Sequence, residues 1–392
     1  MNILFVATHA FSSHRGGIER FCLTLGGRFA EDGHAVHYLA ALDDVQNKDA
    51  LQSFLPDTSS IHTADNARFL EQLVQKTKID IILNQQADNP GWIALCKEVR
   101  QHTGCKVITI LHFDPFHYQH IFRASFFDVS HSGLPLVEKV GLIVRNTLIY
   151  QLRQKRLFGH VYRQALDTSD SFVVLSKEAR PRLLNMIGND AEVDKIVAIS
   201  NPVTLGADIQ SRPTKKKQLL FVGRLEFCAK RPDLLLNIWQ SISPEFPDWQ
   251  LVVVGDGDYL PIMQRLSTQR KLSRITFTGT TDPIPYYQSS SILCITSNCE
   301  GFSLVAVEAS QHYTVPIAFD SYAAVTDVIR DGQTGYIVPA FDISAYTTHL
   351  RQLMSNPAFL EQMSYQAHEY VGRFSLEAIA PQWYQLFNSL KS

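Results

Sequence analysis

Apolar and polar positions alternate in blocks along the whole chain. Short runs of mostly β-branched residues predict buried strands, and the segments between them carry apolar residues at helical spacing. In the amino-terminal half the predicted strands are 2–7, 35–40, 79–83, 106–111, 172–175 and 195–199. Nearly uninterrupted apolar strands that alternate with helices are typical of a parallel sheet covered on both faces. We therefore expect a doubly wound α/β domain.

The carboxy-terminal half repeats this pattern after a change in composition. Residues 200–217 contain Pro202, Gly206, Pro213 and three successive lysines, which predicts a linker. Beyond it, strands are predicted at 218–222, 251–254, 275–278, 291–296, from 315 onward and at 336–338. A short helix carries Tyr286 and Tyr287, and an aromatic-rich helix is predicted at 375–390. The pattern indicates a second α/β domain.

Composition agrees with two domains and excludes some classes of protein. A length of 392 residues fits two domains of nearly equal size. A formal net charge of -2 argues against a basic protein that coats nucleic acid. The six cysteines lack a C-x-x-C pair, which predicts neither a zinc knuckle nor a disulfide framework and favours a reduced, cytosolic setting. Residues 1–7 are interpreted as a strand rather than a signal peptide, and no stretch reaches the ~18 apolar residues of a membrane span.

Two glutamates lie on either side of a predicted helix start within residues 294–316. Glu300 follows the strand 291–296 and a polar turn, and Glu308 lies on the helix that comes next. Ligands of open parallel sheets bind at the carboxyl ends of strands, and helix N-termini favour anions. We expect the backbone amides of Ser303, Leu304 and Val305 to face a phosphate, and both carboxylates to accept hydrogen bonds from hydroxyls. The alternative is two glutamates without a function.

Other strand ends carry further candidates. Gly16 and Gly17 close the loop after the first strand, and His112 follows the strand 106–111, where it would point into a ligand crevice. Arg224 and Lys230 follow the strand 218–222, and a guanidinium and an ammonium suit phosphate oxygens. The alternatives are a flexible glycine turn, a hydrogen-bonded turn histidine and surface salt bridges.

An aspartate pair follows the strand 251–254. Gly255 begins this loop, and Asp256 and Asp258 have the spacing of an Asp-x-Asp metal site. Because that spacing arises easily in a polar turn, the turn is the favoured interpretation.

The run Glu300-Gly301-Phe302-Ser303-Leu304-Val305, with Glu308 eight positions after the first glutamate, resembles the E-x7-E motif of retaining glycosyltransferases of family 4. These are group 1 glycosyltransferases, many of which act in bacterial polysaccharide and lipopolysaccharide synthesis. Gly223-Arg224-Leu225 and the nearby Lys230 add to the resemblance. It implies the GT-B fold, in which two Rossmann-like doubly wound parallel-sheet domains face each other across a cleft.

The resemblance also implies domain limits and roles for residues. Residues 1–205 would form the acceptor domain, on which the last helix, 375–392, packs, and 206–374 the donor domain. Arg224 and Lys230 would bind the nucleotide diphosphate, Glu308 the ribose, and Glu300 and His112 the transferred sugar. The remaining donor-binding residues would be Gly16, Gly17, Gly255, Phe302, Ser303, Leu304 and Val305. Neither a metal nor another cofactor would be needed.

One departure from the family pattern follows the second glutamate. The family usually has glycine near the position of Tyr313, and Pro316 lies one residue further from Glu308 than is common. If the turn there needs a positive φ, a tyrosine costs ~1 kcal/mol or more.

The function that the resemblance implies is transfer of a hexose from a nucleotide diphosphate sugar, with uridine the expected base, to a hydroxyl of a saccharide or lipid-linked saccharide in surface polysaccharide synthesis. One alternative is a nucleotide-sugar 2-epimerase of the same fold, which needs no acceptor. Another is a non-catalytic nucleotide-sugar-binding subunit. The intact Arg224, Lys230, Glu300 and Glu308 argue against the latter.

Residues 139–165 contain six basic residues and no acidic one, interleaved with apolar residues. They predict one long or broken amphipathic helix. Such a helix can lie on an anionic membrane, which would place the protein peripherally on the inner face of the plasma membrane. The alternative is the solvated face of a core helix. Residues 113–136, rich in Phe, Tyr and His, are expected to form a loop that lines the acceptor site.

Overall fold

The computed structural model describes residues 1–13, 16–45, 49–116, 129–130, 132–145, 147–188, 191–204, 209 and 211–391. The chain forms two compact units. The first comprises Met1–Pro115, Lys155–Thr204 and Phe374–Ser392, and the second comprises Phe116–Gln154 and Leu205–Arg373. The described residues of 116–154 thus group with the second unit, whereas the predicted first domain extends over 1–205. The cleft that the resemblance implies stays a prediction.

The first unit contains a seven-stranded sheet in the order β3-β2-β1-β4-β5-β6-β7. Every neighbouring pair in it is parallel. The strands are β1 Asn2–His9, β2 Ala35–Leu42, β3 Ser53–Phe54, β4 Ile81–Asn84, β5 Lys106–Leu111, β6 Ser171–Val174 and β7 Ile196–Ala198. Six of these strands were predicted, and the two-residue β3 was not.

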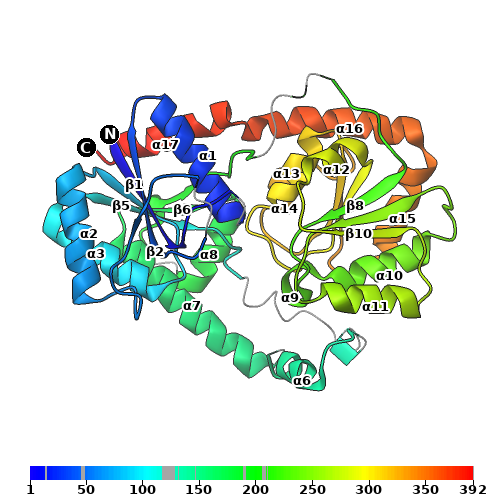
Figure 1. The fold of residues 1–392 in the computed structure, drawn as a ribbon, viewed down its shortest axis with the longest axis horizontal. Coiled ribbons are helices and arrows are strands. Elements are labelled where there is room, and N and C mark those ends of the chain that lie inside the picture. The colour runs from blue at the N-terminus through cyan, green and yellow to red at the C-terminus, as the bar shows by residue number, and fades with distance from the viewer. Residues whose placement is uncertain are drawn as a thin grey trace. The chain divides into compact units, whose positions relative to one another are not determined.

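Helices cover both faces of this sheet. On one face, Leu4, Val6 and Ile82 pack against α2 (Ala64–Thr77) and α3 (Pro90–Thr103). On the other, the Phe5 ring lies 6.3 Å from the ring of Phe29 on α1 (Gly17–Glu31). Phe29 also contacts Phe387 of the last helix, α17 (Leu376–Ser389), at 5.4 Å. Figure 1 shows α17 in red beside α1 in blue, so the end of the chain packs on the first unit.

The second unit contains a six-stranded sheet in the order β10-β9-β8-β11-β12-β13. It too is parallel throughout. Its strands are β8 Gln218–Val222, β9 Gln250–Val254, β10 Ile275–Gly279, β11 Ile292–Ile295, β12 Val315–Phe319 and β13 Tyr336–Val338. The doubly wound fold class predicted for both halves is confirmed.

Helices also surround the second sheet. One apolar cluster joins β8, β9, β11 and β12 to α10 (Pro232–Ile242), α11 (Leu260–Gln269) and α15 (Ile343–Ser355). Near the strand ends lie three shorter helices, α9 Phe227–Lys230, α12 Ile284–Ser289 and α13 Leu304–Gln311. The remaining helices are α6 Leu136–Arg145, α7 Leu148–Thr168, α8 Ala179–Ile187, α14 Val325–Val328 and α16 Pro357–Val371, with 3₁₀ turns at Val193–Lys195 and Gly372–Phe374.

The basic segment 139–165 is broken rather than continuous. It is divided between α6 and α7, and α6 packs on the second unit through Leu142, which joins the core of that unit together with Val129. Within the described ranges, none of the helices combines the length and apolar character that crossing a bilayer requires.

Candidate active site

The loop between β11 and α13 holds the first glutamate close to a lysine. Lys230 Nζ lies 2.5 Å from Glu300 Oε1, and the Ser297 hydroxyl donates to the same oxygen at 2.6 Å. The Lys230 side chain is 20% exposed and that of Glu300 11%, so the pair is largely withdrawn from water yet still reachable. An ion pair in such surroundings is screened less than one on the surface. Two residues 70 positions apart thus form one charged group.

Hydrogen bonds between this loop and α9 bring the pair together. The Asn298 amide donates to the Ala229 carbonyl at 2.8 Å, and its side-chain nitrogen donates to the Cys228 carbonyl at 3.1 Å. The Thr296 hydroxyl donates to the Lys230 carbonyl at 2.9 Å. The sequence and its motifs carry no signal for these contacts, since they join the loop to the backbone of a helix about 70 residues away along the chain.

Arg231 fixes the end of α9, directly after Lys230. It adopts a left-handed backbone conformation with φ +47°, and its guanidinium forms two 2.9 Å hydrogen bonds with Asp233. The guanidinium carbon also lies 5.4 Å from the Phe227 ring centroid and 5.6 Å from that of Phe341. A strained backbone persists only where its surroundings over-determine it. These contacts therefore fix the chain directly after Lys230, at the end of α9.

The helix α13 begins at Leu304, three residues after Gly301. Ser303 precedes the helix with φ +63°, and its side chain does not cap it. Within the described part of the chain, the buried Ser303 hydroxyl has no hydrogen-bond partner. Leu304 and Val305 are partly exposed in the first turn. An uncapped helix start whose first residues are partly exposed suits an anion.

Glu308 lies one turn further along α13 and is buried, with 1% of its surface exposed. The Tyr287 hydroxyl of α12 donates to Glu308 Oε2 at 2.9 Å. The position of Tyr287 on a short helix follows from the sequence, whereas its contact with Glu308 does not. The structure holds this carboxylate in place from a second helix.

Close backbone approach brings together the loops after β8 and β9. Gly223 and Gly255 have φ of +152° and +136°, and a Cβ on Gly255 would lie 2.0 Å from the Gly223 carbonyl oxygen. Only glycine fits such a contact. Arg224 follows with a side chain that is 73% exposed, its Nη1 4.0 Å from Glu226 Oε2. The structure therefore places Arg224 in the same loop region as Lys230 but outside the Lys230–Glu300 pair.

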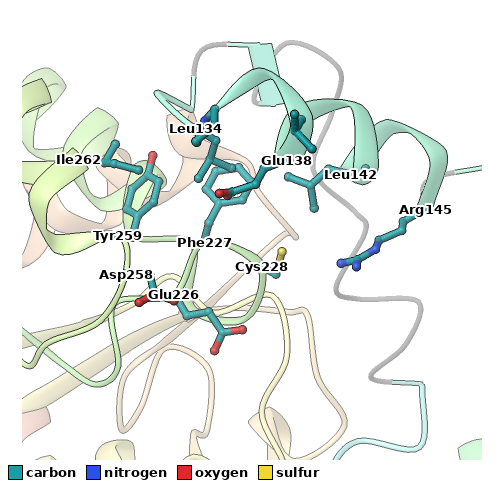
Figure 2. Close-up of a pocket in the computed structure, with 13 residues that line it drawn as sticks. Leu134, Glu138, Leu142, Arg145, Glu226, Phe227, Cys228, Asp258, Tyr259 and Ile262 are labelled. Carbon is teal, nitrogen blue, oxygen red and sulfur yellow. The ribbon is translucent and has the colours of Figure 1, made fainter.

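The aspartates after Gly255 have the contacts of a polar turn. Asp256 Oδ1 accepts a hydrogen bond from the Gly257 amide at 2.7 Å. Asp258 lines a cavity of about 450 Å³ between α6 and α9, where Leu134, Phe227 and Tyr259 gather (Figure 2). None of the predicted site residues lines this cavity. In the described ranges, no three His, Cys, Asp or Glu side chains are grouped so that they could hold a metal ion.

The candidate of the first unit is a neutral histidine. His112 follows β5, and its Nε2 lies 2.7 Å from Gln85 Oε1, while the Gln85 amide nitrogen donates to the Leu83 carbonyl at 3.0 Å. The amide oxygen can only accept, so Nε2 donates and Nδ1 is left as the acceptor nitrogen of the ring. Burial lowers the pKa of His112 to about 3, and the Phe21 ring packs edge-on against it at 5.2 Å.

The paired glycines lie at the start of α1. Gly16 is the N-cap residue, with an extended φ of -167°, and Gly17 begins the helix. A Cβ on Gly16 would lie 3.0 Å from Glu19 Oε2. His14 and Arg15 of the predicted loop lie outside the described residues, as do 117–128 and His131 of the predicted acceptor loop. The roles predicted for these loops stay predictions.

Tyr313 has a positive φ of +61°. This is the conformation that would favour the glycine usual in the family near this position. The helix α13 ends in a Schellman motif, in which the Thr314 amide donates to the Ala309 carbonyl at 2.9 Å and the Tyr313 amide to the Ser310 carbonyl at 3.0 Å. The Tyr313 ring stacks on His368 of α16 at 3.9 Å and 10°. This stacking offsets the backbone cost of a non-glycine residue.

Comparison with known proteins gives the family. The model of glycosyl transferases group 1 matches residues 207–370, and the model of Glycosyltransferase Family 4 matches residues 15–206. Together they cover most of the chain, and each falls on one half. The chain belongs to the group 1 glycosyltransferases with the GT-B fold.

Individual relatives agree with this assignment. An uncharacterized glycosyltransferase of Haemophilus influenzae is 29% identical over 221 residues, which is 56% of this chain and 61% of that protein. The match thus spans less than two thirds of the relative. The lipopolysaccharide outer core galactosyltransferase WaaB has a similar structure, with a TM-score of 0.72, 17% identity and 99% of each chain covered. Anabaena Alr3699/HepE in complex with UDP and glucose gives a TM-score of 0.73, 14% identity and 99% of each chain covered.

Proposed function

We propose that this protein is a retaining glycosyltransferase that moves a hexose from a nucleotide diphosphate sugar to a hydroxyl of a saccharide or lipid-linked saccharide. The observation that carries the proposal is the Lys230–Glu300 pair beside the uncapped N-terminus of α13. Similar structures support a UDP-linked donor and a role in surface polysaccharide synthesis, since one of them holds UDP and another is a lipopolysaccharide galactosyltransferase. A location at the cytoplasmic side of the membrane is part of the proposal.

The departing nucleotide diphosphate gains negative charge as its bond to the anomeric carbon breaks. Lys230 and the amides of Ser303 to Val305 would stabilise the β-phosphate, and Arg224, whose side chain is 73% exposed, would reach the same phosphates. Donors that are fixed before the reaction need no reorganisation when charge develops. These groups would make the reaction independent of a metal ion.

The two glutamates would divide the sugars of the donor between them. Glu308, held by Tyr287, would accept hydrogen bonds from the ribose hydroxyls. Glu300 would accept them from the transferred hexose. Its second carboxylate oxygen is suited to this, because the contacts with Lys230 and Ser297 both involve Oε1.

His112 would position the hexose without a charge. A ring with a pKa of about 3 stays neutral at pH 7, so Nδ1 would accept a hydrogen bond from a sugar hydroxyl. Retention of the anomeric configuration would follow from front-face attack, with the leaving phosphate taking the acceptor proton.

The experiment is transfer from matched nucleotide sugars by the wild-type protein and by Glu300→Gln. Since Gln keeps the shape and loses the charge, turnover should fall far more than the affinity for the free nucleotide diphosphate. Near-wild-type turnover in this variant would remove the role of Glu300. Isomerisation of the sugar nucleotide without any acceptor would instead assign the protein to the epimerases.

A further inference from the structure

Large exposed apolar side chains are concentrated in one short part of the chain. Among the described residues, nine of the twelve exposed large hydrophobic residues fall within 136–157. Of these nine residues, all except Leu157 belong to the second unit. They are 50% to 82% exposed, apart from Ile143 at 39%. We call the following residues the α6–α7 stripe: Leu136, Val137, Val140, Val144, Leu148, Ile149 and Leu152. Exposed apolar patches of this kind mark interaction surfaces.

The stripe occupies one side of α6. At about 100° per residue, Leu136, Val137, Val140 and Val144 share roughly a third of the helix circumference. Leu142 lies on the opposite side, where it is buried in the core of the second unit. Figure 2 shows Leu142 and Glu138 on the side of α6 that faces the cavity. Leu134, two residues before the helix, also lines the cavity, and Val137 lies at the edge between this side and the stripe. Because α6 already uses this side for packing, its apolar opposite side needs another partner.

Contacts before α6 hold it on the second unit. The Tyr259 hydroxyl donates to the Ser132 carbonyl, and Arg265 Nη2 donates to the Gly133 carbonyl at 2.9 Å. Lys139 Nζ also donates to the Ser130 carbonyl at 2.7 Å. The stripe is therefore presented on a helix fixed at its base.

The charge of the same segment identifies the partner. Residues 136–157 contain one acidic residue, Glu138, and five basic ones, Lys139, Arg145, Arg153, Lys155 and Arg156. A second copy that docked stripe against stripe would bring a like charge and be repelled. An anionic lipid surface supplies both the apolar phase and the opposite charge.

We propose that the α6–α7 stripe docks on an anionic membrane surface, with the apolar side chains at the boundary between headgroups and acyl chains. The docking segment is narrower than the 139–165 expected from sequence. Gly159, Val161, Tyr162, Ala165 and Leu166 of α7 are buried in the first unit. The inference does not depend on the transfer reaction, because membrane binding can be measured without a nucleotide sugar.

The test is flotation of the full chain with vesicles of phosphatidylglycerol and phosphatidylethanolamine, and with vesicles of phosphatidylcholine alone. We expect binding to the anionic vesicles and little to the neutral ones. The double variant Val140→Glu/Ile149→Glu should lose binding by more than about tenfold, because it places charge in the apolar phase. Arg153→Gln/Arg156→Gln should bind about 30-fold more weakly. Each basic residue near the surface contributes about 1 kcal/mol, and roughly 1.4 kcal/mol corresponds to a factor of ten in binding.

Leu51→Glu is the matched control, since Leu51 is 98% exposed and lies outside the stripe. It should bind like the wild-type protein. Unchanged thermal unfolding of the double variant shows that it folds. Failure of the wild-type protein to bind anionic vesicles, or equal binding by Val140→Glu/Ile149→Glu, would overturn the proposal. So would dimerisation of the wild-type protein that this double variant abolishes.

Discussion

The two units have sheets of the same kind but different chemistry at the ends of their strands. In the second unit, β8 and β11 lead to the Lys230–Glu300 ion pair, which is charged and partly open to solvent. In the first unit, β5 leads to His112, which is buried, paired with Gln85 and neutral. The same fold can therefore present either a charged or an uncharged group at a strand end. This difference fits a division in which one unit binds a diphosphate and the other positions an uncharged sugar.

The largest expected effect concerns the charged Lys230–Glu300 pair of the second unit. Lys230→Ala removes the ammonium 2.5 Å from Glu300 and should lower turnover by about 10²- to 10³-fold, as for the loss of one preorganised donor. Turnover with saturating donor is the measurement. Lys217→Ala is the matched control, because Lys217 pairs with Asp248 on the surface of the same unit. A comparable loss in both variants would show that turnover depends on the total positive charge of this unit and not on the pair with Glu300.

The next effect concerns the neutral His112 of the first unit. His112 has a pKa of about 3 in the folded protein, against about 6.5 in the unfolded chain. Above pH 6.5 the ring is neutral in both states. Below it, the unfolded state takes up a proton that the folded state does not, so stability falls as the pH falls toward 3. Between pH 6.5 and 4.5 this contribution reaches about 2.7 kcal/mol.

Urea unfolding at several pH values measures this contribution. His112→Asn should lack that part of the pH dependence, whereas His160→Asn, at an exposed position, should keep it. If the unfolding free energy of His112→Asn fell with pH as steeply as that of the wild-type protein, this would contradict the neutral, buried state of the ring.

A smaller effect concerns how Glu308 is held. Tyr287→Phe removes the hydroxyl that donates to Glu308 at 2.9 Å and leaves the carboxylate less well oriented. We expect the affinity for the nucleotide diphosphate to fall at least about tenfold, because a hydrogen bond to a charged group contributes roughly 1.5–3 kcal/mol. Calorimetric titration measures it. Tyr286→Phe, the neighbouring change, should leave the affinity unaltered, and equal losses in both would argue against a specific role for the hydroxyl.

The smallest effect concerns Tyr313, where the chain departs from the family pattern. At φ +61°, glycine should be about 1 kcal/mol more stable than alanine. Tyr313→Gly and Tyr313→Ala both lose the stacking on His368, so their difference isolates the backbone term. Equal unfolding free energies of the two variants would mean that the backbone relaxes there.

The fold could largely be predicted because buried parallel strands are short, continuous apolar runs. Three of them, Lys106–Leu111, Gln218–Val222 and Tyr336–Val338, have the predicted bounds. The strand β3 was missed because two residues are too few for a periodic signal. The compact units differ from the predicted domain limits because Leu142 joins the core of the second unit, and no local pattern records a contact between residues so far apart along the chain.

The candidate site could be predicted as a set of residues, but its contacts could not. The E-x7-E motif and the positions after predicted strands identified Lys230, Glu300 and Glu308 as separate candidates. That Lys230 pairs with Glu300, and that Tyr287 holds Glu308, depends on how α9 and α12 pack against the β11–α13 loop. Ser297, three residues before Glu300 in a polar turn, was the one supporting residue with a local signal.

The central claim is that the second unit binds a nucleotide diphosphate through Lys230 and its surroundings. Calorimetric titration of the purified protein with UDP, GDP and ADP tests it most directly, with Lys230→Ala, Arg224→Ala and the surface control Lys217→Ala alongside. We predict micromolar binding of one diphosphate, weakened at least tenfold in Lys230→Ala and Arg224→Ala and retained in Lys217→Ala. Binding of none of the three by the wild-type protein, or undiminished binding by Lys230→Ala, would contradict the claim.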